Sequence, residues 1–108
     1  MSARYGRRID DNQRSIINLF LMMGASVEPI QSSKAGVFDM MVGCFGIDQW
    51  VEVKPVTSIK ARGELRAEQV EWAARWRGRK PVVVRTPDDV VAVMAALRGA
   101  MTMAEVAR

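Results

Sequence analysis

The amino-acid sequence predicts an α/β fold with a mixed sheet, whose elements follow the order helix, three strands, helix, strand, helix. Three observations predict it. Apolar residues at helical spacing open the chain, and a clear helix start lies near its end. Three short strand-like segments follow the first helix, and another helix pattern separates them from a fourth. A helix in that place serves as a crossover, which gives a sandwich of helices and sheet.

The composition limits the kind of protein. The 108 residues suffice for one domain with a hydrophobic core, but not for two. The net charge of +4 suits a polyanionic partner. Histidine is absent and Cys44 is the single cysteine, which excludes mechanisms that need an imidazole and zinc sites built from cysteines. Carboxylates, lysine and a bound metal remain for hydrolysis. No apolar run is long enough to span a membrane and no secretory leader is visible, so we expect a cytoplasmic, intracellular protein without a membrane partner.

The first helix is predicted from about Asp11 to Met23, with apolar residues at three-to-four spacing and Gly24 as its stop. Residues 1–9 before it carry three arginines and form a basic, flexible arm that either touches phosphates or stays solvated. The segment Ser26 to Ile30 is a strand candidate, and its proline marks it as a sheet edge.

Two further strands are predicted as antiparallel neighbours. Alternation gives a second strand from Val37 to Val42 and a third from Gln49 to Val53. Residues 43–48, with two glycines, make the hairpin connection. In the second strand the alternation places Asp39 on one face and Phe38 on the other.

The second half of the chain supplies the crossover and the closing helix. Good helix formers predict a helix from about Arg66 to Arg77, and residues 81–85 form a short, continuously apolar strand typical of the middle of a sheet. Thr86 caps the last helix, which we expect to end at Leu97 or Arg98, before Gly99. Residues 99–108 then form a tail or another short helix.

Charged residues sit in the middle of this pattern. Asp39 lies in an apolar strand, and Glu52 and Lys54 lie two residues apart in the next one, so they share a face. Burying an ion costs several kcal/mol unless it is paired or bound to a metal. Carboxylates that converge in this way indicate a metal-dependent nuclease site, because Mg²⁺ is a hard cation that binds carboxylate oxygens.

Four motifs carry a family resemblance: Gly36-Val37-Phe38-Asp39, Val51-Glu52-Val53-Lys54, Leu65 to Gln69 with Trp72, and Trp76-Arg77-Gly78 before an apolar strand. Together they resemble the PD-(D/E)XK superfamily, and more narrowly its virus-type replication and repair nuclease (VRR-NUC) domains. The resemblance covers residues 10–98. It implies a restriction-endonuclease-like three-layer sandwich of order αβββαβα. Two departures are Phe38, where the family usually has proline, and a first helix without the glutamate that relatives often use as a ligand.

The resemblance implies a role for each site residue. Asp39, Glu52 and the backbone carbonyl of Val53 would hold Mg²⁺ or Mn²⁺, and Lys54 would position or activate water or stabilise charge on the phosphate. Gln69 would orient water, the lysine or the phosphate. Three basic residues are expected to contact phosphates: Lys60, Arg62 and Arg66. Asp10 and Asp11, near the first helix, are either metal ligands or helix-capping groups.

Each assignment has a structural alternative. Glu52 and Lys54 alone are also consistent with an exposed ion pair, and Gln69 with a hydrogen bond that joins a helix to the sheet. The tryptophans at positions 50, 72 and 76 suit a core or a subunit interface better than base stacking.

The function expected from the resemblance is a small, phage-type endonuclease that cuts branched, junction or flap DNA and acts as a homodimer. One alternative is a catalytically inactive nuclease fold that binds DNA or a partner protein. Another is a small restriction or tRNA-splicing type of enzyme. The absence of histidine and of an added recognition region disfavours that last alternative.

Overall fold

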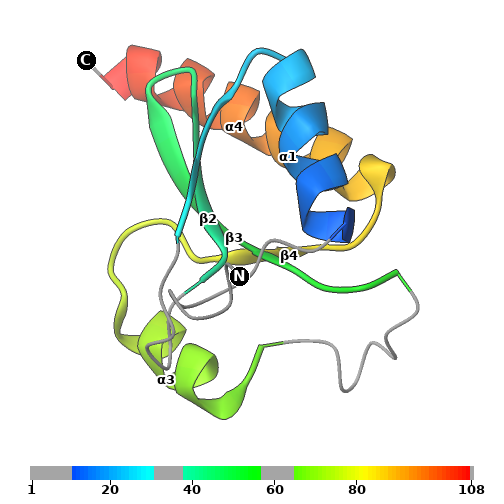
Figure 1. The fold of residues 1–108 in the computed structure, drawn as a ribbon. Helices are drawn as coiled ribbons and strands as arrows, with labels where there is room; N and C mark the ends of the chain where they lie inside the picture. Colours follow the sequence, from blue (N-terminus) through cyan, green and yellow to red (C-terminus); the bar gives the residue numbers. More distant parts are fainter. Residues whose placement is uncertain (1–10, 31–37, 57–64, 108) are drawn as a thin grey trace.

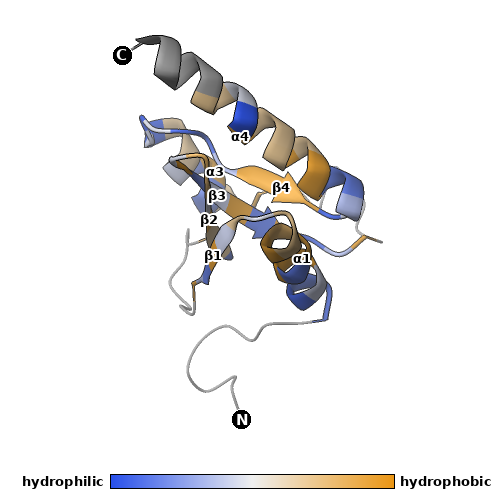
Figure 2. Ribbon diagram, turned by 90° about the horizontal axis from the view of Figure 1, so that it is seen from above, coloured by the Kyte–Doolittle hydropathy of each residue, from blue (hydrophilic) through white to orange (hydrophobic). Residues whose placement is uncertain are grey.

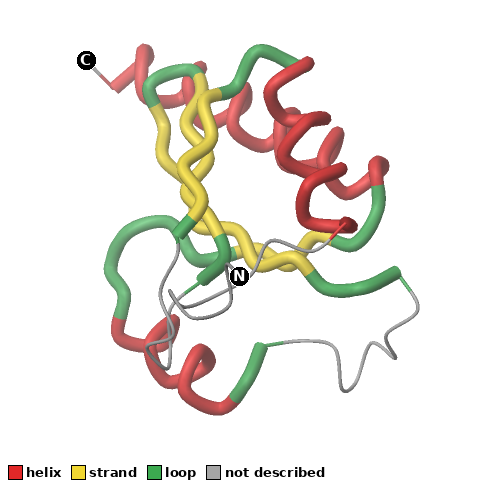
Figure 3. Tube along the Cα trace, in the orientation of Figure 1, coloured by secondary structure: helices red, strands yellow, loops and turns green. Residues whose placement is uncertain are grey.

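The computed structural model describes residues 11–30, 38–56 and 65–107, without the side chains of residues 102–107. Seven elements follow one another along this part of the chain (Figures 1 and 3): α1 (Asp11–Met22), β1 (Ser26–Pro29), β2 (Met40–Cys44), β3 (Ile47–Val53), α3 (Ala67–Arg75), β4 (Val82–Val84) and α4 (Pro87–Ala107). The predicted α/β class and the predicted order of elements are confirmed.

The strands form one mixed sheet in the order β1-β2-β3-β4. The pairs β1–β2 and β2–β3 are antiparallel, whereas β3 and β4 are parallel. Helices α1 and α4 lie on one side of the sheet and α3 lies on the other (Figure 1). Parallel neighbours need a crossover connection, and α3 is the helix within it.

The hydrophobic core lies between the sheet and the pair α1 and α4. Alternate residues of β2 and β3 point into this core. Strand β4 and the middle of α4 also contribute side chains to it, which explains why both are strongly hydrophobic (Figure 2). The buried side chains of this core come from both layers: Ile16, Phe20, Met40, Val42, Val51, Val84, Val90, Met94 and Leu97.

A second apolar cluster joins α3 to the other face. Phe38 lies edge-on to Trp72 with 5.1 Å between ring centroids, and Trp50 lies 6.0 Å from Trp72. The alternation predicted Phe38 on the face of Met40, and this prediction is wrong. Phe38 precedes the first paired residue of β2, so strand alternation does not fix its direction.

The hairpin between β2 and β3 is tighter than predicted. The strand predicted from Val37 begins at Met40, so Asp39 stands just before the ladder, and it continues to Cys44. Phe45 and Gly46 alone make the turn, with φ angles of 58° and 76°. Two positive φ angles belong to a type I′ turn, which usually contains Asn-Gly. Phe-Gly lacks that signal, so the sequence suggested a longer loop.

The two later helices also differ from their predicted bounds. Helix α3 is shorter than expected, because Trp76 already has an extended ψ of 126°. Helix α4 is longer, since it continues past Gly99 to Ala107 instead of ending at Arg98. Gly99 is not among the described glycines with positive φ, so it does not act as a helix stop. The alanines around it favour a continuous helix.

Two other expectations concern the ends of the chain and membranes. The basic arm at residues 1–9 lies outside the described residues. Within the described ranges, none of the helices has the length and apolar character needed to cross a bilayer.

The position of Gly99 gives a stability prediction. Gly99→Ala should raise the free energy of unfolding by about 0.5–1 kcal/mol, because alanine favours the helix interior and a Cβ there would meet no atom within 4 Å. Gly24→Ala is the contrasting variant and should be destabilising, because Gly24 has a φ of 93°. Urea denaturation measures both. Destabilisation by Gly99→Ala would place a helix end at that residue.

Candidate active site

The two carboxylates of the motif meet at the end of the β2–β3 hairpin that lies away from its turn. Asp39 is 4% exposed and Glu52 is 2% exposed. Met40 pairs with Val51, so the antiparallel register brings Asp39 opposite Glu52. One oxygen of Asp39, Oδ2, accepts the backbone N–H of Val53 at 2.7 Å. The fold therefore holds two acidic side chains together in a buried position.

Glu52 is surrounded by donors and positive charges. The Gln69 amide donates to its Oε1 at 3.0 Å. On the other oxygen, Lys54 Nζ lies at 3.3 Å and Arg66 Nη1 at 3.6 Å. Lys54 is 16% exposed and Arg66 is 44% exposed, so the arginine lies on the solvent side. A buried carboxylate requires such partners, because an uncompensated buried charge is strongly unfavourable.

Burial raises the pKa of Glu52 above its ordinary value, and the nearby charge of Asp39 raises the pKa further. The charge of Lys54 and the hydrogen bonds from Gln69 and Lys54 act in the opposite direction. Burial, the larger cause, and the charge of Asp39 thus outweigh the positive charge and the hydrogen bonds around Glu52. Shifted ionisation of this kind is typical of functional sites.

The start of α3 fixes the position of Gln69. Its side chain is fully buried, and its Oε1 accepts the backbone N–H of Arg66 at 3.0 Å while its amide group binds Glu52. One side chain thus joins the helix to the sheet and orients the carboxylate. This contact agrees with the structural alternative for Gln69, and it also makes Gln69 a positioning residue for Glu52.

The end of β3 is held by contacts that the sequence did not indicate. The Asn12 amide donates to the Lys54 carbonyl at 3.0 Å, and the Lys54 N–H donates to the Val84 carbonyl at 3.0 Å. The backbone that carries Lys54 is therefore tied to α1 and to β4. Next to Asn12, Gln13 is 4% exposed. The sequence does contain two amide side chains, Asn12 and Gln13, at the start of the first helix, where acidic ligands were expected. They were the one feature from which these contacts could have been inferred.

The structure brings most of the predicted site residues together. Asp39, Glu52, Lys54 and Gln69 converge, and Arg66 joins them through Glu52. Asp11 is exposed in the first turn of α1 and is not one of the side chains in contact with Glu52. Three predicted residues lie outside the described part of the chain: Asp10, Lys60 and Arg62. For Val53 the N–H contact to Asp39 is described, and the role of its carbonyl stays a prediction.

The donor set suits a hard divalent cation. The buried carboxylates of Asp39 and Glu52 offer oxygen ligands of the type that Mg²⁺ and Mn²⁺ bind with additional waters. Among the described residues there is no group of three or more His, Cys, Asp or Glu side chains placed to hold a metal. A cation at this site would have to be held by the pair Asp39 and Glu52 together with waters.

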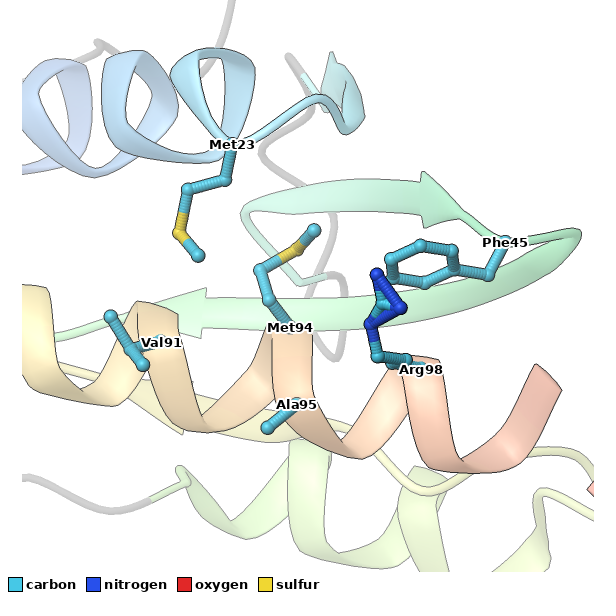
Figure 4. Close-up of a pocket in the computed structure, with 6 residues that line it drawn as sticks. All are labelled: Met23, Phe45, Val91, Met94, Ala95 and Arg98. Atoms are coloured by element: carbon cyan, nitrogen blue, oxygen red, sulfur yellow. The ribbon is translucent and has the colours of Figure 1, made fainter. Parts of the chain in front are cut away.

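A pocket of about 330 Å³ lies elsewhere, at the turn of the hairpin. Figure 4 shows Met23 from the end of α1, Phe45 from the turn, and Val91, Met94 and Arg98 from α4 around it. Arg98 lies over the Phe45 ring at 5.3 Å. The carboxylates are at the other end of β3, which is about 20 Å long at ~3.3 Å per residue. This pocket is separate from the candidate site.

Comparisons of the chain with known proteins leave its family open. No protein-family model, curated protein or solved structure matches it. The similarity to VRR-NUC domains thus stays a hypothesis based on the four motifs, and the geometry of the site has to carry the functional argument.

The raised pKa of Glu52 predicts how stability depends on pH. In the folded chain Glu52 binds its proton more tightly than in the unfolded chain, where the pKa of Glu52 is near 4.5. This contribution to stability is fully present below pH 4.5 and is lost as the pH rises through the raised pKa. Glu52→Gln removes the buried charge, so its stability relative to the wild type should increase over that pH range.

The measurement is urea denaturation in EDTA from about pH 4 to about pH 7, within the range where such linkage is usually seen. Asp48→Asn, which removes an exposed carboxylate from the same strand, is the matched control. If the stability of Glu52→Gln relative to the wild type falls as the pH rises, the prediction is contradicted.

Proposed function

We propose that this chain is a metal-dependent endonuclease that hydrolyses phosphodiester bonds of DNA on a restriction-endonuclease-like fold. The observation that carries the proposal is the buried pair Asp39 and Glu52, with Lys54 and Arg66 beside it. The mixed sheet, with the pair Asp39 and Glu52 next to a parallel crossover, supports the fold that the motifs imply. The net charge of +4 supports a polyanionic substrate.

A divalent cation explains why two carboxylates are buried together. Burial and the charge of Asp39 raise the pKa of Glu52, so a divalent cation beside the two carboxylates would favour the ionised form of Glu52. Asp39 and Glu52 would hold Mg²⁺ or Mn²⁺, which when bound supplies a Lewis acid for the phosphate and lowers the pKa of water. The Val53 carbonyl is the third ligand in this proposal.

Three other residues would position water, the carboxylate and the phosphate. Lys54 Nζ, 3.3 Å from Glu52, is placed to hold the attacking water or to stabilise negative charge on the phosphate. Gln69 keeps the Glu52 carboxylate in one orientation through its hydrogen bond. Arg66 lies nearer the solvent, so it is the cation that an approaching phosphate meets.

The substrate class and assembly complete the proposal. Branched DNA, including junctions and flaps, is the class that the family resemblance implies. A homodimer would place two sites on one branched duplex, because two copies related by a twofold axis act on two strands.

A second candidate function is supported by a specific observation. The Glu52 carboxylate already has an amide donor and two cations within the protein, so the site is partly neutralised without a metal. A nuclease-type fold that binds DNA without cutting it would show the same contacts.

A cleavage assay separates the two functions. Labelled linear, flap and four-way-junction DNA is incubated with the protein in Mg²⁺, Mn²⁺ or EDTA. We expect metal-dependent cutting that falls by about 10²–10⁴-fold in Lys54→Ala and Asp39→Asn, the range for loss of a catalytic group. Asp48→Asn, an exposed aspartate on β3, should cut like the wild type. Cutting that persists in EDTA would refute the metal mechanism, and binding without cutting would favour the second candidate.

Removing the Arg66 side chain should change the affinities for a metal ion and for DNA in opposite directions. Its guanidinium lies 3.6 Å from Glu52, so a metal cation at the same carboxylate is repelled by it. Arg66→Ala should bind Mn²⁺ about three- to tenfold more tightly and DNA more weakly. Calorimetry with MnCl₂ and fluorescence anisotropy with labelled DNA measure these effects. Arg14→Ala, an exposed arginine on α1, is the control; weaker binding of both ligands by Arg66→Ala would contradict this role.

A further inference from the structure

An exposed tryptophan stands at the far end of α3 from the candidate site. Trp76 follows the last residue of the helix and is 41% exposed. Its indole stacks on Trp72, with ring centroids 4.6 Å apart and an angle of 17° between the planes. Trp72 in turn packs against Phe38 and Trp50, so the outer indole rests on an aromatic cluster in which Phe38 is buried and the two tryptophans are half-buried. Large aromatic side chains left exposed on a rigid support are typical of binding surfaces.

Neighbouring residues hold Trp76 in this position. Lys80 Nζ donates to the Trp76 carbonyl and to the Ala73 carbonyl, both at 2.6 Å. Gly78 lies against the indole, and a Cβ at that residue would come within 2.7 Å of Trp76 Nε1. A residue larger than glycine at position 78 would therefore displace the ring. The exposed indole is held in place by its surroundings.

The sequence next to the exposed ring is rich in basic residues. Residues 72–87 contain no acidic residue and five basic ones: Arg75, Arg77, Arg79, Lys80 and Arg85. Arg75 and Arg77 flank Trp76, are exposed, and form no ion pair within the described part of the chain. Arg79 differs, because it donates to Gln49 Oε1 at 2.8 Å. An exposed aromatic residue between two exposed arginines of the chain offers the groups that bind an unpaired base and its phosphates.

We propose that Trp76, Arg75 and Arg77 bind single-stranded DNA. The Trp76 indole stacks on an unpaired base, and the two arginines contact the phosphates on either side. Base stacking on an aromatic side chain contributes about 1–3 kcal/mol per base and does not depend on sequence. The surface therefore recognises an unpaired strand without reading its bases.

The geometry of α3 links this surface to the proposed nuclease site, and this step rests on the proposed function. Arg66 and Gln69 lie at the start of α3, and Trp76 lies at its end. Nine helical residues at ~1.5 Å per residue span about 14 Å. That length corresponds to about four stacked nucleotides at ~3.4 Å each. Gln69, which contacts Glu52, lies within this span, so a base on Trp76 would select DNA that is unpaired within about four nucleotides of the phosphate cut at Glu52.

A second copy of the chain is a poorer occupant for the same surface. A twofold axis through Trp76 would bring Arg75 and Arg77 of both copies together. Like charges brought together across an interface are costly, whereas a phosphate backbone neutralises them. Charge complementarity therefore favours DNA.

The test is binding of a fluorescent oligonucleotide, followed by anisotropy in EDTA so that cleavage plays no part. The probes are a single-stranded oligonucleotide and a blunt duplex of the same sequence. Trp76→Ala should weaken binding of the single strand by about 5- to 150-fold, which corresponds to ~1–3 kcal/mol of stacking. Binding of the duplex should stay within about twofold of the wild type. Val70→Ala, an exposed residue on the same helix, is the matched control.

Further variants keep the test decisive if Trp76→Ala does not fold. Trp76→Phe should retain most of the affinity, and Gly78→Ala, which displaces the ring, should lose much of it. The double variant Arg75→Ala and Arg77→Ala should weaken binding and reduce its dependence on salt. Unchanged single-strand binding in Trp76→Ala and Gly78→Ala overturns the proposal.

Analytical ultracentrifugation tests whether a second copy of the chain covers Trp76. A dimer that dissociates in Trp76→Ala while single-strand binding is unchanged shows that a second copy covers the surface, and it overturns the proposal. Because the binding assay needs no cleavage, a chain that never cuts DNA still tests this surface. Failure of the nuclease proposal and failure of this inference are therefore distinguishable.

Discussion

The burial of the Glu52 carboxylate is the constraint on which the rest of this structure depends. Its charge is unfavourable in the interior, so the fold brings a buried amide and two cations to it from β3 and α3. The crossover helix is therefore bound to the sheet by a polar network as well as by apolar packing. A substitution that disturbs this network affects the attachment of α3 and the chemistry of the site together.

The two faces of the sheet differ in the side chains that pack on them. The face toward α1 and α4 is apolar and contains the main core, which gives most of the hydrophobic stabilisation. The opposite face carries a cluster of aromatic rings next to the carboxylates. Aromatic packing holds α3 in place beside charges that repel each other. The placement of Gln69 and Trp76 thus follows from contacts that are not themselves catalytic.

The sequence predicted the fold class, the element order and the convergence of Asp39, Glu52 and Lys54. The alternation along β3 made this possible, because side chains two residues apart in a strand share a face. The prediction failed at Phe38, which lies outside the ladder, and at Gly99, where neighbouring helix formers outweigh one glycine. The sequence did not show that Arg66 contacts Glu52 or that Asn12 holds the end of β3. Both contacts join segments far apart in the chain, and local patterns contain no information about them.

The parallel pairing of β3 with β4 also determines the order in which the site assembles. The β2–β3 hairpin closes through a two-residue turn, so its contacts are local and form quickly. Pairing with β4 requires the whole crossover to be in place, and closing that long segment costs more conformational entropy. We therefore expect Asp39 and Glu52 to meet before Gln69 and Arg66 reach them. Until α3 is in place, the Glu52 carboxylate has Lys54 beside it but lacks the amide of Gln69 and the guanidinium of Arg66.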